Sequence, residues 1–258
     1  MIARRGVALV LVLWLVVILG GIGALVVRDA RTSSALAGNV RAAAVARFAA
    51  ESGLEATIAE IERRLAAMSD TVEAGTYLNG LAGSPRDSIM LGDGRAAVAI
   101  DDPSTRLDVN EAPEANLAAL LSRVGEPGRA TATARAIRRW IERAPASTGD
   151  GRLQPGPTRF VTPLRSLDAL REVPGVDVEL VTRAAPYLTI DGDGTVNVTA
   201  ASDTVLGAAF GERRTTPSRL LLISRGWFAG HPLTHEIQGA YAISGTRLVL
   251  VHWRERSL

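Results

Sequence analysis

Few side chains of this sequence are of types that do chemistry, and their spacing argues against catalysis. The absence of Cys excludes thiolate nucleophiles and thiolate metal sites. His231, His235 and Glu236 have a spacing that a zinc site could use, but Pro232 breaks the helical arrangement and strand-like segments flank it. We therefore expect a turn before a strand there. Since no Ser/His/Asp set, phosphate-binding loop or carboxylate pair stands out, we predict that the protein is not an enzyme.

A second candidate for chemistry is the acidic segment Asp191-Gly-Asp193-Gly194, which begins like a calcium-binding loop. Thr195 and Val196 then break the pattern at the positions where an EF-hand needs further oxygen ligands. Asp191 and Asp193 are therefore only weak calcium candidates, and an ordinary acidic turn is the simpler interpretation.

A third candidate is the segment Val173-Pro-Gly-Val-Asp177 between two helical patterns, which resembles a helix-hairpin-helix module. Such a module binds DNA phosphates through backbone N–H groups. Asp177 and Glu179 would repel phosphates, and the simpler interpretation is a sterile-alpha-motif-like (SAM-like) domain used for packing. A membrane-tethered or exported DNA-binding protein of this type stays the alternative, although we expect no nucleic acid as a partner.

The balance of charges also speaks against DNA. Every basic residue is Arg, and Arg4 and Arg5 account for the whole formal net charge of +2. The remaining chain is neutral, whereas nucleic-acid binders carry a basic footprint. The isoelectric point near 9.6 reflects the scarcity of groups that titrate near neutrality, since the chain has only 3 His.

The elements that must position these residues begin with an apolar run from Val7 to Val27. A helix of about 20 residues spans roughly 30 Å, the thickness of a bilayer core. Arg4 and Arg5 before the run predict a cytoplasmic N-terminus and a main body on the other side of the membrane. The run is too long for a cleaved secretory signal, although Ala35 and Ala37 offer a small-residue site for that alternative.

The helical pattern continues beyond the apolar run. Leu54, Ile58, Ile61 and Leu65 recur at helical spacing and indicate one face of an amphipathic helix. We predict one continuous helix from about Val7 to about Ala67, roughly 90 Å long at 1.5 Å per residue. Residues 75–94, rich in Gly, Ser, Pro and Asp, predict a loop.

The rest of the chain divides into a segment with short helical patterns and a later segment with strand patterns. A strand is predicted over 95–100, and residues 104–200 show short helical patterns (115–124, 130–143, 166–173 and 178–188) with an irregular linker at 144–163. The stretches Arg106–Glu114 and Thr195–Asp203 echo each other, each as an extended segment, a turn and a capped helix. Residues 218–227, 236–243 and 246–254 predict strands, and Ser244-Gly245 predicts a hairpin. The pattern predicts an α+β fold in which a long N-terminal helix packs on a C-terminal antiparallel sheet, with an inserted all-α domain.

This order of parts resembles the type IV pilin-like proteins. Arg-Gly before a bilayer-length helix matches a prepilin leader, and most such proteins carry Glu at the fifth mature position, where this sequence has Leu11. The missing Glu and the insert with RLDVNEAPE and TVNVTAAS resemble one family over nearly the whole chain, the type II secretion system protein K (GspK), a large minor pseudopilin.

The resemblance implies roles for particular residues. Gly6 would precede the prepilin peptidase cut, and Val7 would become the methylated mature N-terminus. Leu11 would suit a subunit at the pseudopilus tip, because no preceding subunit offers an amine to pair with a buried carboxylate. The face from Val40 through Leu54, Ile58, Ile61 and Leu65 is predicted to contact other subunits.

The resemblance also implies an organisation and a setting. Expected divisions are a leader (1–6), a transmembrane segment (7–27), a pilin-like helix and first strand (28–103), an inserted helical domain (104–200) and a β-meander (201–258). Expected partners are the minor pseudopilins I and J, the major pseudopilin and the prepilin peptidase, at the inner membrane with the soluble part in the periplasm. Family members carry calcium, but the resemblance maps no ligand onto this chain. A minor pilin of a related type IV pilus system remains an alternative.

Overall fold

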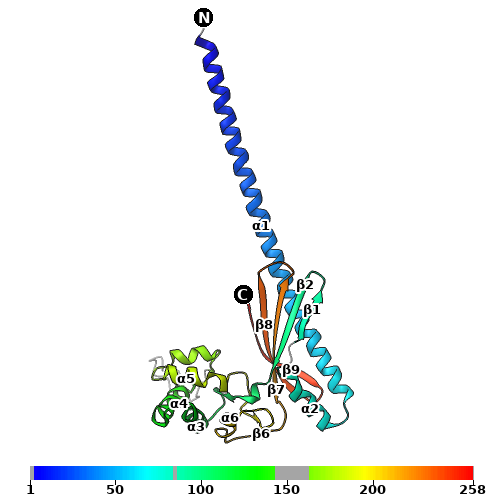
Figure 1. Ribbon diagram of the computed structural model, residues 1–258, viewed down its shortest axis with the longest axis vertical. Helices are drawn as coiled ribbons and strands as arrows, with labels where there is room; N and C mark the ends of the chain where they lie inside the picture. The colour runs from blue at the N-terminus through cyan, green and yellow to red at the C-terminus, as the bar shows by residue number, and fades with distance from the viewer. Residues whose placement is uncertain (1–2, 84–85, 143–162, 258) are drawn as a thin grey trace, which may run out of the picture.

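The computed structural model describes residues 3–83, 86–142 and 163–257, without the side chains of residues 3–8, 86–88, 91 and 257. A single long helix projects from a body that contains an antiparallel sheet and a group of short helices (Figure 1). The α+β, pilin-like class predicted from the sequence is confirmed.

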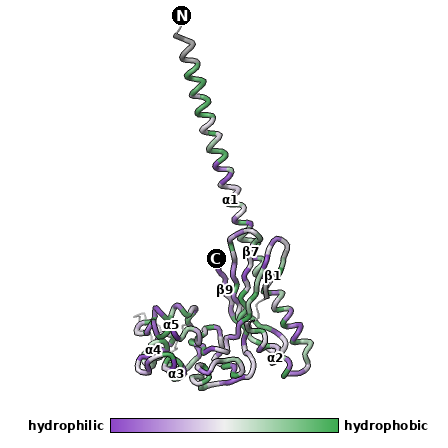
Figure 2. Tube along the Cα trace, in the orientation of Figure 1, coloured by the Kyte–Doolittle hydropathy of each residue, from purple (hydrophilic) through white to green (hydrophobic). Residues whose placement is uncertain are grey.

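Helix α1 (Ala3–Ala67) is 65 residues long and has no break. Its N-terminal half carries the apolar run and extends away from the body, as the hydropathy colouring of Figure 2 shows. Its C-terminal half lies against one face of the sheet. The prediction of one continuous helix is confirmed. The helix can run this far because no proline interrupts the 3.6-residue pattern before Pro85.

The sheet has five strands in the order β1-β2-β7-β8-β9, and every neighbouring pair is antiparallel. The strands are β1 (Arg86–Leu91), β2 (Gly94–Asp101), β7 (Arg219–Phe228), β8 (Thr234–Ser244) and β9 (Arg247–Ser257). The predicted strands near 95–100, 218–227, 236–243 and 246–254 all exist. Gly245, with φ +60°, lies in the predicted turn between β8 and β9.

Small residues let α1 approach the sheet closely. A Cβ atom on Gly226 of β7 would lie 2.1 Å from the carbonyl oxygen of Ala46 and 2.4 Å from the amide nitrogen of Ala50. The hydroxyl of Ser224 donates to the carbonyl oxygen of Ala50 over 2.7 Å. Further along the helix, Leu54, Ile61 and Leu65 join Leu220, Leu222 and Ile237 of the sheet in one buried core.

The prediction of a loop over residues 75–94 is wrong. Helix α2 (Thr71–Leu81) and strand β1 occupy most of it. Asp70 caps α2 by accepting from the amide of Val72, and Leu78 and Leu81 are buried in the α1–sheet core. Tertiary packing thus overrides a composition rich in turn formers.

A helical lobe, whose core spans residues 107–209, is inserted in sequence between β2 and β7. Its helices are α3 (Glu114–Val124), α4 (Pro127–Ile141), α5 (Val178–Ala184) and α6 (Asp203–Leu206), with 3-10 turns η1 (Pro103–Thr105), η2 (Leu167–Glu172) and η3 (Ala185–Tyr187). The core includes Val205, Ala208 and Ala209, so it continues past residue 200. The linker predicted at 144–163 lies outside the described residues apart from Pro163.

The echo noted in the sequence corresponds to two similar structural units. In the first, β3 (Leu107–Asp108) pairs in parallel with β4 (Leu188–Thr189). In the second, β5 (Val196–Asn197) pairs in parallel with β6 (Arg213–Arg214). In each unit a side-chain oxygen of the last strand residue caps the following turn, since Asp108 accepts from the amide of Asn110 and Asn197 from that of Thr199.

Candidate functional site

The N-terminal half of α1 is the first candidate surface. Among the described residues, one helix is long and apolar enough to cross a membrane, and no part of its most apolar window is buried against the rest of the chain. Leu11 lies in this window with 65% of its surface exposed. Gly6 and Val7 lie in the first turns of the same helix, but their side chains are outside the description.

Most of the face predicted to contact other subunits is buried inside this chain. Leu54 is 2% exposed, Ile61 and Leu65 lie beside it in the core, and Ile58 packs against its rim. The prediction is corrected here, because helical periodicity identifies a face that needs burial without saying what covers it. Only Val40, at 62% exposure, remains free for another subunit.

A different face of α1 carries the exposed apolar side chains beyond the membrane segment. Leu36, Val40, Ala44 and Phe48 recur every four residues and are all exposed, and we call them the outer stripe. Phe48 and Ala44 lie on the side of the helix opposite Ala46 and Ala50, which touch the sheet. Each step of four residues rotates by about 40°, so the stripe turns toward the flank of the helix at Val40 and Leu36. The four-residue spacing of these side chains can be read from the sequence. From the sequence alone, this exposed stripe was not distinguished from the buried face of the same helix.

In the hairpin that resembles a phosphate-binding module, backbone N–H groups already donate hydrogen bonds to acceptors of the same chain. The carboxylate of Asp177 caps α5 by accepting from the amide of Leu180 over 3.1 Å, and it is ion-paired with Arg129. The amide of Val176 donates to the carbonyl of Val173. A phosphate at this helix start would meet a carboxylate in the place where it needs N–H groups.

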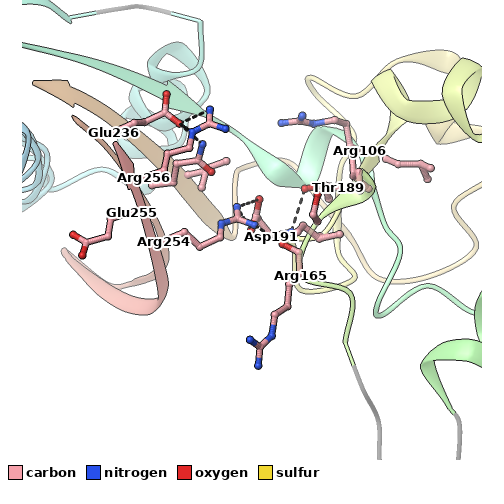
Figure 3. A pocket seen from close by; sticks show the side chains of 14 residues that line it. Arg106, Arg165, Thr189, Asp191, Glu236, Arg254, Glu255 and Arg256 are labelled. Carbon is pink, nitrogen blue, oxygen red and sulfur yellow. Dashed lines mark hydrogen bonds and ion pairs between the residues drawn. The ribbon is translucent and has the colours of Figure 1, made fainter. Parts of the chain in front are cut away.

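Polar contacts join the helical lobe to the sheet at a junction centred on Asp191 and Asp193. Asp191 is bound by both oxygens to Arg254 Nη2 of β9, each at 2.9 Å (Figure 3). It also lies 2.8 Å from His252 Nε2. Asp193 Oδ1 accepts from the hydroxyls of Thr195 at 2.7 Å and Ser218 at 3.0 Å. These contacts fix the lobe to the outer face of the sheet.

The two aspartates therefore do not fit a calcium site. Both oxygens of Asp191 face a guanidinium group, and Oδ1 of Asp193 accepts from two hydroxyls, so both side chains are already used in bonds within the chain. Within the described ranges, no group of three or more His, Asp or Glu side chains converges as metal ligands do.

The histidines considered for zinc do not converge either. His231 accepts from the amide of Leu233, whereas His235 lies 3.5 Å from Glu255. Glu236 points to the opposite face of β8, because successive strand residues alternate. The turn before a strand that we expected is what the structure has.

Glu236 and Asp108 are buried carboxylates with opposite pKa shifts. Burial raises the pKa of Glu236, but hydrogen bonds from Arg225 and Gln238 and the charges of Arg225 and Arg256 outweigh it, so its pKa lies below the usual value. For Asp108, burial outweighs three backbone N–H donors and raises its pKa. Both carboxylates accept hydrogen bonds from other groups of the chain.

A cleft of about 440 Å³ lies between the sheet and the lobe (Figure 3). Asp191 and Glu236 lie in its wall and are each paired with arginines of β9, Arg254 and Arg256. Nucleophile, base and orienting group do not come together in this cleft, so its geometry suits a joint between two parts of the molecule rather than a catalytic centre.

Comparisons with known proteins show which fold this chain shares. No family model matches the sequence, and no curated protein matches it. Among solved structures, a chain of the GspK-GspI-GspJ complex from the type 2 secretion system of enterotoxigenic Escherichia coli is similar, with a TM-score of 0.50 and 15% identity. The match covers 67% of this chain and 84% of that chain. At this identity the likeness shows a pseudopilin-like fold, and nothing finer.

Proposed function

We propose that this chain is a minor pseudopilin of a type II secretion system, of the protein K kind, and that it is a structural subunit rather than an enzyme. The observation that carries the proposal is the combination of an exposed bilayer-length helix with a pseudopilin-like sheet and a helical lobe inserted into it. The similarity to a chain of the GspK-GspI-GspJ complex supports it.

The proposed steps of membrane insertion, processing and assembly follow from the properties of α1. Arg4 and Arg5 keep the N-terminus in the cytoplasm, so the body lies in the periplasm and the chain crosses the inner membrane once. A prepilin peptidase cuts between Gly6 and Val7 and methylates Val7. The apolar half of α1 then leaves lipid and packs against the helices of other subunits. The outer stripe extends this apolar surface toward the body, so we assign it, through Val40, to subunit contact.

The proposed position is the tip of the pseudopilus. The helical lobe lies at the end of the molecule remote from the N-terminus of α1 (Figure 1), where it would obstruct a subunit stacked above it. Leu11 supports the same position, because a tip subunit has no preceding amine that would neutralise a buried carboxylate. The proposed partners are therefore the minor pseudopilins I and J and, below them, the major pseudopilin.

Co-purification tests the proposal. The full chain, tagged and co-expressed with the I- and J-type pseudopilins of its own system, should purify with both from detergent extracts. Val40→Glu and Phe48→Glu, which place charge in the outer stripe, should reduce recovery of the partners at least about fivefold, whereas Val72→Glu, at an equally exposed position on α2, should not. Failure to recover I and J, or recovery of type IV pilus minor pilins in their place, would contradict the assignment.

A further inference from the structure

Strand β9 forms one edge of the sheet and is unusually apolar for an edge. It pairs with β8 on one side, and within the described part of the chain no strand follows it on the other side. Val249, Leu250, Val251 and Trp253 are 52%, 52%, 44% and 42% exposed. The outer backbone N–H and C=O groups of such a strand can pair with a further strand. At Leu248 the amide is already used, because it donates to Oε1 of Glu62 in α1 over 2.9 Å, so the stretch open to pairing begins at Val249.

The edge is protected along only half its length. Natural edge strands carry charges or proline that prevent pairing with other chains. In β9 the charged residues Arg254, Glu255 and Arg256 lie toward the C-terminal end. The first residue, Arg247, is paired with Glu62 of α1, and Leu248–Val251 has neither charge nor proline. A bulge at Val251, where the register passes from Tyr241↔Leu250 to Ala240↔His252, separates the two halves.

A cleft adjoins the C-terminal half of the strand. It measures about 410 Å³ and is lined by Pro163, Leu164 and Ile190 of the lobe together with His252 and Trp253 of β9. The carbonyl of Arg165 accepts from Arg254 Nη1 over 3.1 Å, which holds this wall of the cleft beside the strand. A side chain of an added strand could enter here.

The charge around this half of the edge is positive. Glu236 is a single carboxylate that accepts from two guanidinium groups, Arg225 at 2.5 Å and Arg256 at 3.0 Å, so one positive charge is in excess. Arg165 is exposed, points away from Asp191 in Figure 3, and has no carboxylate partner in the part of the chain that the structure describes. The surface favours acidic residues in whatever binds there.

We propose that β9 accepts an extended segment of a partner protein as a sixth strand of the sheet. The segment is apolar where it lies beside Val249–Val251 and acidic where it reaches Arg165 and Arg256. Backbone pairing requires an extended chain, which a docked helix or a lipid surface does not supply. A second copy of β9 fits less well, because an antiparallel β9 pair brings three arginines and one glutamate from each copy to an edge that is already positive.

The proposal goes beyond the function proposed above and does not depend on it. The outer stripe on α1 and the edge of β9 are separate surfaces, so co-purification with pseudopilins and strand addition at β9 can succeed or fail independently.

Peptide binding to the full chain in detergent micelles tests the proposal. The probe is a fluorescent peptide of about ten residues, the length of a long strand, that alternates valine with threonine in one half and glutamate with threonine in the other. It should bind saturably. The same peptide with lysine in place of glutamate, or with alternate backbone nitrogens methylated, should bind at least about tenfold more weakly.

Variants of the chain locate the site. Val249→Glu and Arg165→Glu should each weaken binding of the acidic peptide about tenfold or more, and their thermal midpoints establish that both remain folded. The matched controls are Val72→Glu on α2 and Arg171→Glu on η2, which are also exposed and should change affinity less than about twofold.

Three results would overturn the proposal. One is the absence of saturable binding by the acidic peptide. Another is equal binding by the N-methylated or lysine peptide, which would mean that backbone pairing or charge plays no part. The third is a concentration-dependent dimer, measured by sedimentation, that Val249→Glu abolishes, since this would assign the edge to a second copy of the chain.

Discussion

Asp108 and Asn197 occupy equivalent positions in the two repeated units, yet their second side-chain atoms have opposite requirements. Oδ2 of Asp108 accepts from the amide of Gly192 over 2.7 Å. Nδ2 of Asn197 donates to Oδ1 of Asn79 and to Oδ2 of Asp102, each over 2.8 Å. A carboxylate and an amide of nearly equal size are thus not interchangeable at these two positions.

We predict that exchanging either residue for the other type destabilises the protein. In Asp108→Asn, one amide N–H group would face the N–H of Gly192 and leave a buried donor without an acceptor, despite the loss of a buried charge. In Asn197→Asp, a carboxylate would face Asp102. Each change should lower the free energy of unfolding by about 1–3 kcal/mol, measured by chemical denaturation in micelles. A more stable Asp108→Asn variant would show that burial of charge outweighs the hydrogen bond.

The elements show what the sequence could and could not predict. Helix α1 and strands β2, β7, β8 and β9 were predictable, because proline-free helical periodicity and β-branched runs bounded by turn residues are local signals. Helix α2 was missed because Gly75 and its neighbours have low helix propensity, and burial of Leu78 and Leu81 compensates for it. Similarly, η2 and η3 are 3-10 turns where longer α-helical patterns were expected, with Pro186 in η3.

The candidate surfaces were less predictable than the elements. Leu54, Ile61 and Leu65 were assigned to contacts with other subunits but pack on the sheet of the same chain. The junction of lobe and sheet was missed for a related reason, since Asp191 and Arg254 are far apart in sequence and only the fold brings them within 2.9 Å. Periodicity identifies a buried face, whereas its partner depends on tertiary structure.

The approach of α1 to β7 gives a prediction at the scale of elements. Gly226→Val should lower the free energy of unfolding by about 3 kcal/mol or more, because even its Cβ would overlap the backbone of Ala46 and Ala50, which cannot move as a side-chain tip can. Thermal unfolding monitored by circular dichroism measures the effect. Gly128→Ala in α4 is the control, since a Cβ there meets nothing within 4 Å and the change should be neutral or slightly stabilising. Equal midpoints for the two variants would contradict the described packing.

At the scale of the whole molecule, two hydrophobic cores are joined by polar contacts. The lobe core and the α1–sheet core have no buried residue in common. Asp193 accepts from Thr195 and from Ser218, the residue before β7. Burial raises the pKa of Asp193, but hydrogen bonds from Thr195 and Ser218 and the charge of Arg219 outweigh it, so its pKa lies below the usual value. The lobe is therefore held to the sheet partly by an ionised carboxylate.

Acid should loosen this junction. The folded-state pKa of Asp193 is lowered, so its ionised carboxylate stabilises the folded state. This contribution to the free energy of unfolding is complete above the unfolded pKa of about 3.9 and is lost as pH falls through the lower folded pKa. Thermal midpoints below pH 4 should thus fall more steeply for the natural chain than for Asp193→Asn, which has no charge to lose there. Parallel pH profiles for the two proteins would show that Asp193 does not couple lobe and sheet through its charge.

The N-terminal mass of the full chain, co-expressed with a prepilin peptidase, tests the central claim most directly. The account predicts a mature chain that begins with methylated Val7, and it predicts that Gly6→Leu leaves the leader in place, because a bulky residue before the cut blocks the peptidase. A chain cut near Ala35 or Ala37 would contradict the account and indicate an ordinary secreted protein. An intact N-terminus would indicate a plain membrane anchor and would equally contradict it.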